Sequence, residues 1–144
     1  MVDTSILIDP PAESALPEET SVSAFTLAEL VAGVHATHDP NERAARHDRL
    51  QRVQATLEAL PFDAEAARAY GRVFAAITGA GRKARGKRAI DLLIAATALS
   101  VGLPLYTRNI GQILGNPIGK NFAGDRDGGP AFQRATRDRA KCKY

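Results

Sequence analysis

Two spacings of apolar residues recur along the chain, and together they predict alternating strands and helices. Short apolar runs bounded by proline or polar residues predict buried strands at residues 1–9, 21–25, 60–62 and 103–107. Apolar positions three to four residues apart predict amphipathic helices at about residues 26–36, 41–58 and 64–79. A run from Ala89 to Leu99 is apolar on nearly all sides, which predicts a central buried helix closed by Gly102. Elements in this order predict an α/β fold of three layers, α/β/α, around a central, mostly parallel sheet.

The length of 144 residues fits one domain of common size, which we place at residues 1–122. Residues 123–144 hold the whole formal net charge of +3, are rich in glycine, arginine and aspartate, and predict a basic, flexible tail without a closing strand. No apolar run approaches the roughly 18 residues of a membrane span, and because no basic region comes before the first apolar stretch, we expect no secretory signal. The one cysteine, Cys142, suits a reducing compartment, so we expect a cytoplasmic protein that does not bind membranes.

Three acidic residues occupy comparable positions in the predicted elements. Asp3 lies in the first strand, Glu29 early in the helix after the second strand, and Asp91 at the start of the buried helix. Each acid also has a structural explanation, since Glu29 has capping-box spacing from Thr26 and Asp91 lies in a first helical turn. If parallel strands bring the acids to one edge of the sheet, their mutual repulsion favours a hard cation such as Mg²⁺ or Mn²⁺.

A cation held by these carboxylates activates water for attack on a phosphodiester. Nearby hydroxyl and amide groups would orient the water or the carboxylates, and the candidates are Thr4, Ser5, Thr107 and Asn109. A basic cluster before the buried helix would meet phosphates, although such clusters are also common on solvated faces; its members are Arg82, Lys83, Arg85, Lys87 and Arg88. These residues point to metal-dependent phosphodiester cleavage.

Four segments carry a resemblance to a known family. They are Met-Val-Asp-Thr-Ser-Ile-Leu-Ile-Asp at 1–9, Thr-Leu-Ala-Glu-Leu at 26–30, Ala-Ile-Asp-Leu-Leu-Ile-Ala-Ala-Thr-Ala at 89–98, and Leu-Tyr-Thr-Arg-Asn at 105–109. Their order and spacing resemble the four motifs of PIN-domain ribonucleases, and the chain is most similar to VapC-type toxins of bacterial toxin–antitoxin systems. The resemblance covers residues 1 to about 110.

The resemblance implies a PIN-like fold and a Mg²⁺- or Mn²⁺-dependent endoribonuclease that cuts structured RNA such as tRNA or rRNA. It also implies a toxin homodimer and a VapB-like antitoxin that inserts a C-terminal segment into the active-site groove. Asp3, Glu29 and Asp91 match the metal-binding acids of the family. Thr4 or Ser5, together with Asn109, matches its supporting polar positions.

The chain departs from the family pattern after residue 109. Gln112 stands where such proteins usually place another acid, and it offers a neutral oxygen in place of a charge. Asp125 or Asp127 in the tail would have to replace that acid. The departure supports an alternative hypothesis, a catalytically weakened binding module that engages antitoxin or RNA. A receiver-type or phosphatase-like domain is disfavoured because the first strand lacks paired aspartates and no later strand ends in lysine.

Overall fold

The computed structural model describes residues 1–11, 16–81, 83, 85–108 and, as a strand only, 132–134. Two pairs of parallel strands form its sheet: β1 (Ser21–Ser23) pairs with β2 (Glu58–Leu60), and β3 (Leu105–Thr107) pairs with β4 (Phe132–Arg134). Because residues 1–3 lie between β1 and β3, the order across the sheet is β2, β1, residues 1–3, β3 and β4.

Backbone hydrogen bonds hold residues 1–3 in the middle of the sheet. The amide of Val2 donates to the carbonyl of Ser21 at 2.9 Å, and the amide of Tyr106 donates to the carbonyl of Met1 at 2.9 Å. The amide of Asp3 donates to the carbonyl of Tyr106 at 3.1 Å, and Val2 forms a parallel bridge with Tyr106. In a parallel sheet the carboxyl ends of the strands share one edge, so Asp3 and the end of β3 lie at the same edge.

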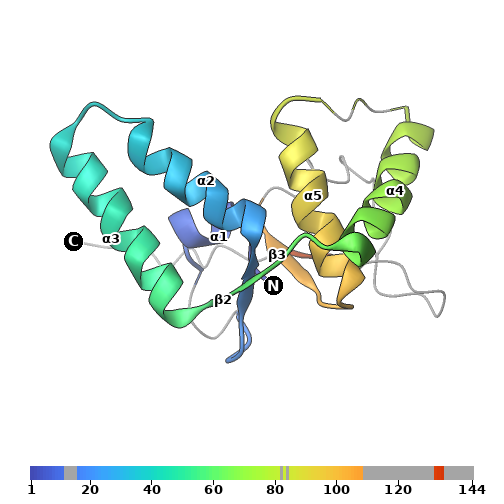
Figure 1. Ribbon diagram of the computed structural model, residues 1–144, viewed down its shortest axis with the longest axis horizontal. Helices are drawn as coiled ribbons and strands as arrows, with labels where there is room; N and C mark the ends of the chain where they lie inside the picture. The colour runs from blue at the N-terminus through green and yellow to red at the C-terminus, as the bar shows by residue number, and fades with distance from the viewer. Residues whose placement is uncertain (12–15, 82, 84, 109–131, 135–144) are drawn as a thin grey trace, which may run out of the picture.

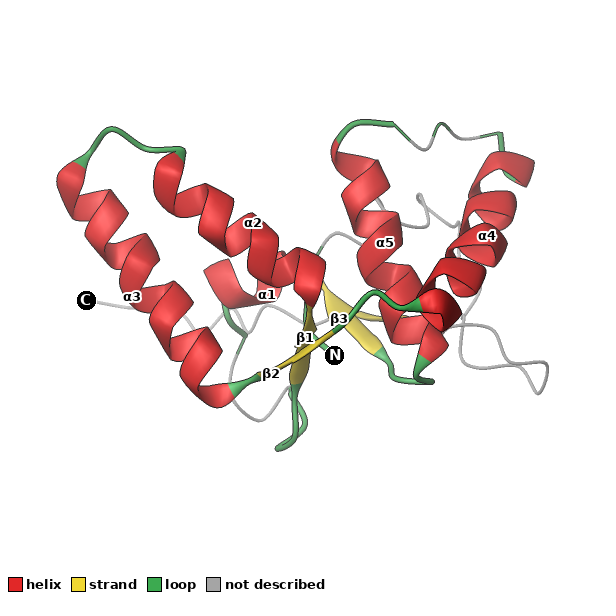
Figure 2. Ribbon diagram, in the orientation of Figure 1, coloured by secondary structure: helices red, strands yellow, loops and turns green. Residues whose placement is uncertain are grey.

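Figure 1 shows two antiparallel helix pairs, α2 with α3 and α4 with α5, and a short helix α1 beside α2. Figure 2 shows the strands between and below these pairs. The helices are α1 (Thr4–Ile8), α2 (Ala24–His35), α3 (Pro40–Thr56), α4 (Ala64–Gly79) and α5 (Lys87–Ser100). None of the helices in the described residues is both long and apolar enough to cross a bilayer.

Two apolar clusters hold these layers together. One joins α4, α5 and β3, and α5 is buried on nearly all sides, as its sequence predicts. The other joins α1, α2, α3 and β1, with Ile6, Val22 and Leu30 among its buried members. The predicted α/β order and the helix at 64–79 are confirmed, and the other helix limits shift by only a few residues.

Two expectations about strands are wrong. The first strand does not run to residue 9, because the Asp3 carboxylate caps a helix that begins at Thr4. The basic tail, expected to contain no closing strand, contributes β4, which extends the sheet beside β3. Pairing with β4 satisfies backbone groups that β3 would otherwise expose at a sheet edge.

Candidate active site

Asp3 ends the central strand and caps α1. Its Oδ1 accepts hydrogen bonds from the Ser5 amide at 3.0 Å, the Ile6 amide at 3.2 Å and the Ser5 hydroxyl at 2.6 Å. None of these bonds uses Oδ2, and the residue is only 6% exposed. Asp3 therefore has a definite structural role, and one carboxylate oxygen is still available for a ligand.

Ser5 and Arg108 fix the position of α1 against the end of β3. The Ser5 hydroxyl oxygen accepts a hydrogen bond from the Arg108 amide at 3.0 Å while its hydroxyl donates to Asp3. The Arg108 Nε donates to the Asp9 carbonyl at 2.6 Å and lies 3.3 Å from the Asp9 carboxylate. The Asp3 carboxylate is thus oriented by contacts that reach across the sheet. The sequence reasoning gave Arg108 no role, although the residue directly follows Thr107.

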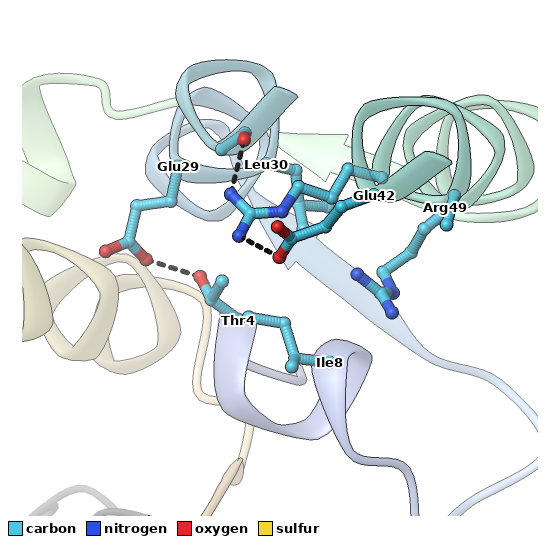
Figure 3. Close-up of a pocket in the computed structure, with 9 residues that line it drawn as sticks. Thr4, Ile8, Glu29, Leu30, Glu42 and Arg49 are labelled. Carbon is cyan, nitrogen blue, oxygen red and sulfur yellow. Dashed lines mark hydrogen bonds and ion pairs between the residues drawn. The ribbon is translucent and has the colours of Figure 1, made fainter. Parts of the chain in front are cut away.

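Glu29 is oriented by a residue of α1. The Thr4 hydroxyl donates to Glu29 Oε2, as Figure 3 shows, and both side chains are partly buried. The capping box considered for Thr26 and Glu29 does not form, because Ser23 is the N-cap of α2 and its Oγ accepts from the Thr26 amide at 2.9 Å. Glu29 is therefore not needed to satisfy the start of its own helix.

Asp91 lies two residues further into α5 than expected, past its first turn, because the helix begins at Lys87. Its Oδ2 is buried and has no hydrogen-bond partner among the described residues. Burial, followed by the nearby charges of Glu29 and Asp3, raises the pKa of Asp91 to about 6, although Lys87 and Arg88 act in the opposite direction. A buried carboxylate oxygen without a partner is unfavourable unless a proton or a cation compensates it.

The three predicted acids share one pocket of about 270 Å³, which we call the acidic pocket. Its lining residues are Asp3, Thr4, Ser5, Ile8, Asp9, Glu29, Lys87, Asp91, Ile94 and Arg108. The structure thus brings together residues from α1, α2 and α5 that lie far apart in the sequence. Thr107 is fully buried at the end of β3 and does not line the pocket.

The donor set of the acidic pocket fits a hard divalent cation. It offers carboxylate oxygens, the ligands that Mg²⁺ and Mn²⁺ prefer, and includes the unpartnered Oδ2 of Asp91. Within the described part of the chain, no three His, Cys, Asp or Glu side chains already have the spacing of a metal site. Binding would therefore require these carboxylates to move closer together than they lie in this structure.

The predicted basic cluster borders this pocket. Lys83, Arg85, Lys87 and Arg88 line a neighbouring open hollow of about 440 Å³ together with Asp91, and Lys87 also lines the acidic pocket. Cationic side chains thus lie beside the carboxylates, on the side of Asp91. Five residues considered above lie outside the described residues, namely Arg82, Asn109, Gln112, Asp125 and Asp127.

Comparisons with known proteins find related sequences and structures. A family model described as the PIN domain matches residues 1–112. Ribonuclease VapC5 of Mycobacterium tuberculosis is 36% identical over 114 residues, which span 76% of this chain and 82% of that protein. The crystal structure of VapBC-5, a member of the VapBC family of toxin-antitoxin systems from the same species, matches with a TM-score of 0.69 and 34% identity, covering 92% of this chain and 94% of that one. The structure of VapBC-1 from nontypeable Haemophilus influenzae matches with a TM-score of 0.61 and 27% identity, over 78% of this chain and 87% of that one.

Proposed function

This chain belongs to the PIN domain family, and from that premise we propose that it is a VapC-type ribonuclease toxin. In this proposal it is a Mg²⁺- or Mn²⁺-dependent endoribonuclease that cuts structured RNA such as tRNA or rRNA in the cytoplasm. The observation that carries the proposal is the acidic pocket, in which Asp3, Glu29 and Asp91 meet and Asp91 Oδ2 has no partner among the described residues.

The proposal assigns a role to each of the three acids. Asp3 and Asp91 hold the cation, and Glu29 either holds it or positions the attacking water. A divalent cation bound there lowers the pKa of water and neutralises charge on the phosphodiester. Ser5 orients the carboxylate of Asp3 and Thr4 that of Glu29, through the hydrogen bonds they already donate.

The basic cluster gives the proposed substrate a place to bind. Lys83, Arg85, Lys87 and Arg88 would contact RNA phosphates beside the acidic pocket, and such contacts weaken as salt is raised. Lys87 lies between the two hollows, so it would contact the phosphate nearest the reacting bond. We assign Arg82 to the same cluster from its place in the sequence.

The proposal includes two protein partners. One is a VapB-like antitoxin that neutralises the toxin, and the other is a second copy of this chain in a homodimer. Support for the antitoxin comes from a structural neighbour described as a member of the VapBC family of toxin-antitoxin systems. Support for the homodimer comes from the family resemblance.

The direct test is cleavage of total bacterial RNA by the purified protein. We expect discrete fragments with Mg²⁺ or Mn²⁺, and intact RNA both in EDTA and with the Asp91→Asn variant. The matched control is Asp48→Asn, which removes an exposed acid of α3 that lines neither the acidic pocket nor the basic hollow, and it should cleave as the wild type does. Intact RNA from a folded wild-type protein under every condition would favour the weakened binding module instead.

A further inference from the structure

A second depression continues from the acidic pocket toward α3. One part, of about 290 Å³, shares Thr4, Ile8 and Glu29 with the acidic pocket. The next part, of about 370 Å³, shares Ile8 and Arg49 with the first. Ile8 lines all three hollows and is 55% exposed, so the surface is continuous across this side chain. We call the two parts together the α3 groove.

Two arginines give the α3 groove a positive charge. Arg49 lines both parts and Arg52 lines the second, where none of the described lining residues is acidic. In the first part, Glu42 is paired with Arg46 at 2.5 Å and Glu29 balances the charge of Arg49, so the net positive charge lies in the second part. In Figure 3 the Arg49 side chain extends from α3 toward α1, at the opposite end of the pocket from Glu29.

These two arginines differ from their neighbours on the same helix. Arg43 donates to the Thr37 carbonyl at 2.9 Å and Arg46 donates to the Gly33 carbonyl at 2.6 Å, so both connect α3 to the end of α2. Among the described residues, the guanidinium groups of Arg49 and Arg52 make no hydrogen bond or ion pair. Their positions are therefore not explained by a contact with another described residue.

We propose that the RNA strand passes from the acidic pocket over Ile8 into the α3 groove, where Arg49 and Arg52 bind its phosphates. The inference rests on the proposed function. Guanidinium groups suit phosphates because they donate paired hydrogen bonds and stay charged. The apolar side chains of Leu7, Ile8 and Leu16 offer the bases and sugars a contact surface between the charges.

The groove completes a path with cations on both sides of the reacting bond. The basic cluster, with Lys87 and Arg88, borders the acidic pocket from α5, and Arg49 and Arg52 extend from α3. A strand bound at both ends would hold one phosphodiester over the three acids, although their charge alone repels it. An acidic peptide also suits two arginines, but continuity with the acidic pocket favours the substrate.

The test measures binding of a labelled single-stranded RNA in EDTA, where the proposed enzyme does not cut it. We expect the double variant Arg49→Ala/Arg52→Ala to bind the RNA about 10-fold more weakly. The slope of log binding constant against log salt concentration should also become shallower by about 1.4, because each lost phosphate contact on a single strand contributes about 0.7. Arg49→Lys/Arg52→Lys should restore most of the slope because it keeps the charge. The control Arg72→Ala, an exposed arginine of α4 that lines neither groove nor acidic pocket, should bind as the wild type does.

Shortening the RNA from each end tests which part of the strand contacts the α3 groove. Removing nucleotides from one end should abolish the difference between the wild type and the double variant, while removing them from the other end should abolish the effect of Lys87→Ala. Wild-type affinity and slope in the double variant would overturn the inference, and so would a difference that persists whichever end is shortened. Loss of poly-glutamate binding with unchanged RNA binding would assign the groove to a protein partner.

A parallel cleavage assay separates this inference from the proposed function. If the wild type cuts RNA with Mg²⁺ and the double variant binds RNA normally, the α3 groove is not part of the substrate path and the nuclease assignment stands. If the wild type neither binds nor cuts RNA, the proposed function fails and the inference fails with it.

Discussion

Helices α5 and α3 border the acidic pocket and its groove, but they are built differently. α5 is buried on nearly all sides and presents Asp91 to the pocket. Of the 17 residues of α3, Leu50 and Val53 are buried, whereas Arg49 and Arg52 line the α3 groove. A metal-binding carboxylate needs a fixed position, which dense packing supplies, whereas phosphate-binding arginines act from long side chains on a solvated helix. Substitutions at the buried apolar positions of α5 should therefore affect the fold, whereas those of Arg49 and Arg52 on α3 should affect only binding.

The largest difference should appear when each helix loses one side chain. Leu92 is fully buried, so Leu92→Ala should lower the free energy of unfolding by about 3 kcal/mol, which corresponds to a Tm lower by about 10 °C. Arg49→Ala, on α3, should change the free energy of unfolding by less than about 0.5 kcal/mol. Thermal and urea unfolding measure both. Equal losses of stability would contradict the contrast between the helices.

A smaller change in the free energy of unfolding should follow from removing the charge of Asp91, the acid that α5 presents to the acidic pocket. The pKa of Asp91 is raised from 3.8 to about 6 in the folded protein, chiefly by burial, so the ionised carboxylate destabilises the fold. The penalty is fully present above pH 6, shrinks as the pH falls through 6, and is absent below about 3.8. In EDTA, Asp91→Asn should thus raise the free energy of unfolding by about 1–2 kcal/mol at pH 7.5, after allowance for solvent screening, and by only a small fraction of that at pH 4.

Urea unfolding at the two pH values checks this expectation. Asp48→Asn on α3 serves as the control, because that acid is exposed and should give no gain at either pH. A variant Asp91→Asn that is less stable than the wild type at pH 7.5 would mean that the carboxylate stabilises the metal-free fold, contrary to this account.

The smallest change in stability should distinguish the two roles of Asp3, which are to cap α1 and to supply a charge for cleavage. Asparagine caps helices as well as aspartate does, so Asp3→Asn should leave stability nearly unchanged, whereas Asp3→Ala should cost about 1 kcal/mol. Both variants should lose RNA cleavage, because both lose the charge. Asp63→Ala, which removes the cap of α4 away from the pocket, should cost a similar amount of stability and keep cleavage. Cleavage by Asp3→Asn at the wild-type rate would restrict Asp3 to its structural role.

Much of the fold could be predicted from the sequence. The order of strands and helices and the buried run in α5 follow from apolar spacing, and the resemblance to PIN-domain and VapC-type proteins is confirmed. The end of the first strand could not be predicted, because Ile6, Leu7 and Ile8 favour a strand and only the capping bonds of Asp3 show that a helix begins. The strand β4 could not be predicted, because Phe132, Gln133 and Arg134 include only one apolar residue. This strand is stabilised by pairing with β3, which no local pattern in the sequence shows.

The acidic residues of the candidate site could be predicted from the sequence, but the residues around them could not. Motif spacing singled out Asp3, Glu29 and Asp91, which the structure places in one pocket; their roles remain predictions. The contacts of Arg108 with Asp9 and Ser5 depend on residues about a hundred positions apart, which no local pattern shows. Arg49 and Arg52 resemble any charged helix surface in the sequence, and only the continuity of the α3 groove with the acidic pocket distinguishes them.

The central claim is that the acidic pocket binds a divalent cation through Asp91 and its neighbours. Mn²⁺ binding, followed by the electron paramagnetic resonance signal of the free ion, tests this claim without RNA or turnover. We predict saturable binding by the wild type and by Asp48→Asn, and binding at least about 10-fold weaker by Asp91→Asn. Equal Mn²⁺ affinity in the wild type and in a folded Asp91→Asn variant would contradict the account.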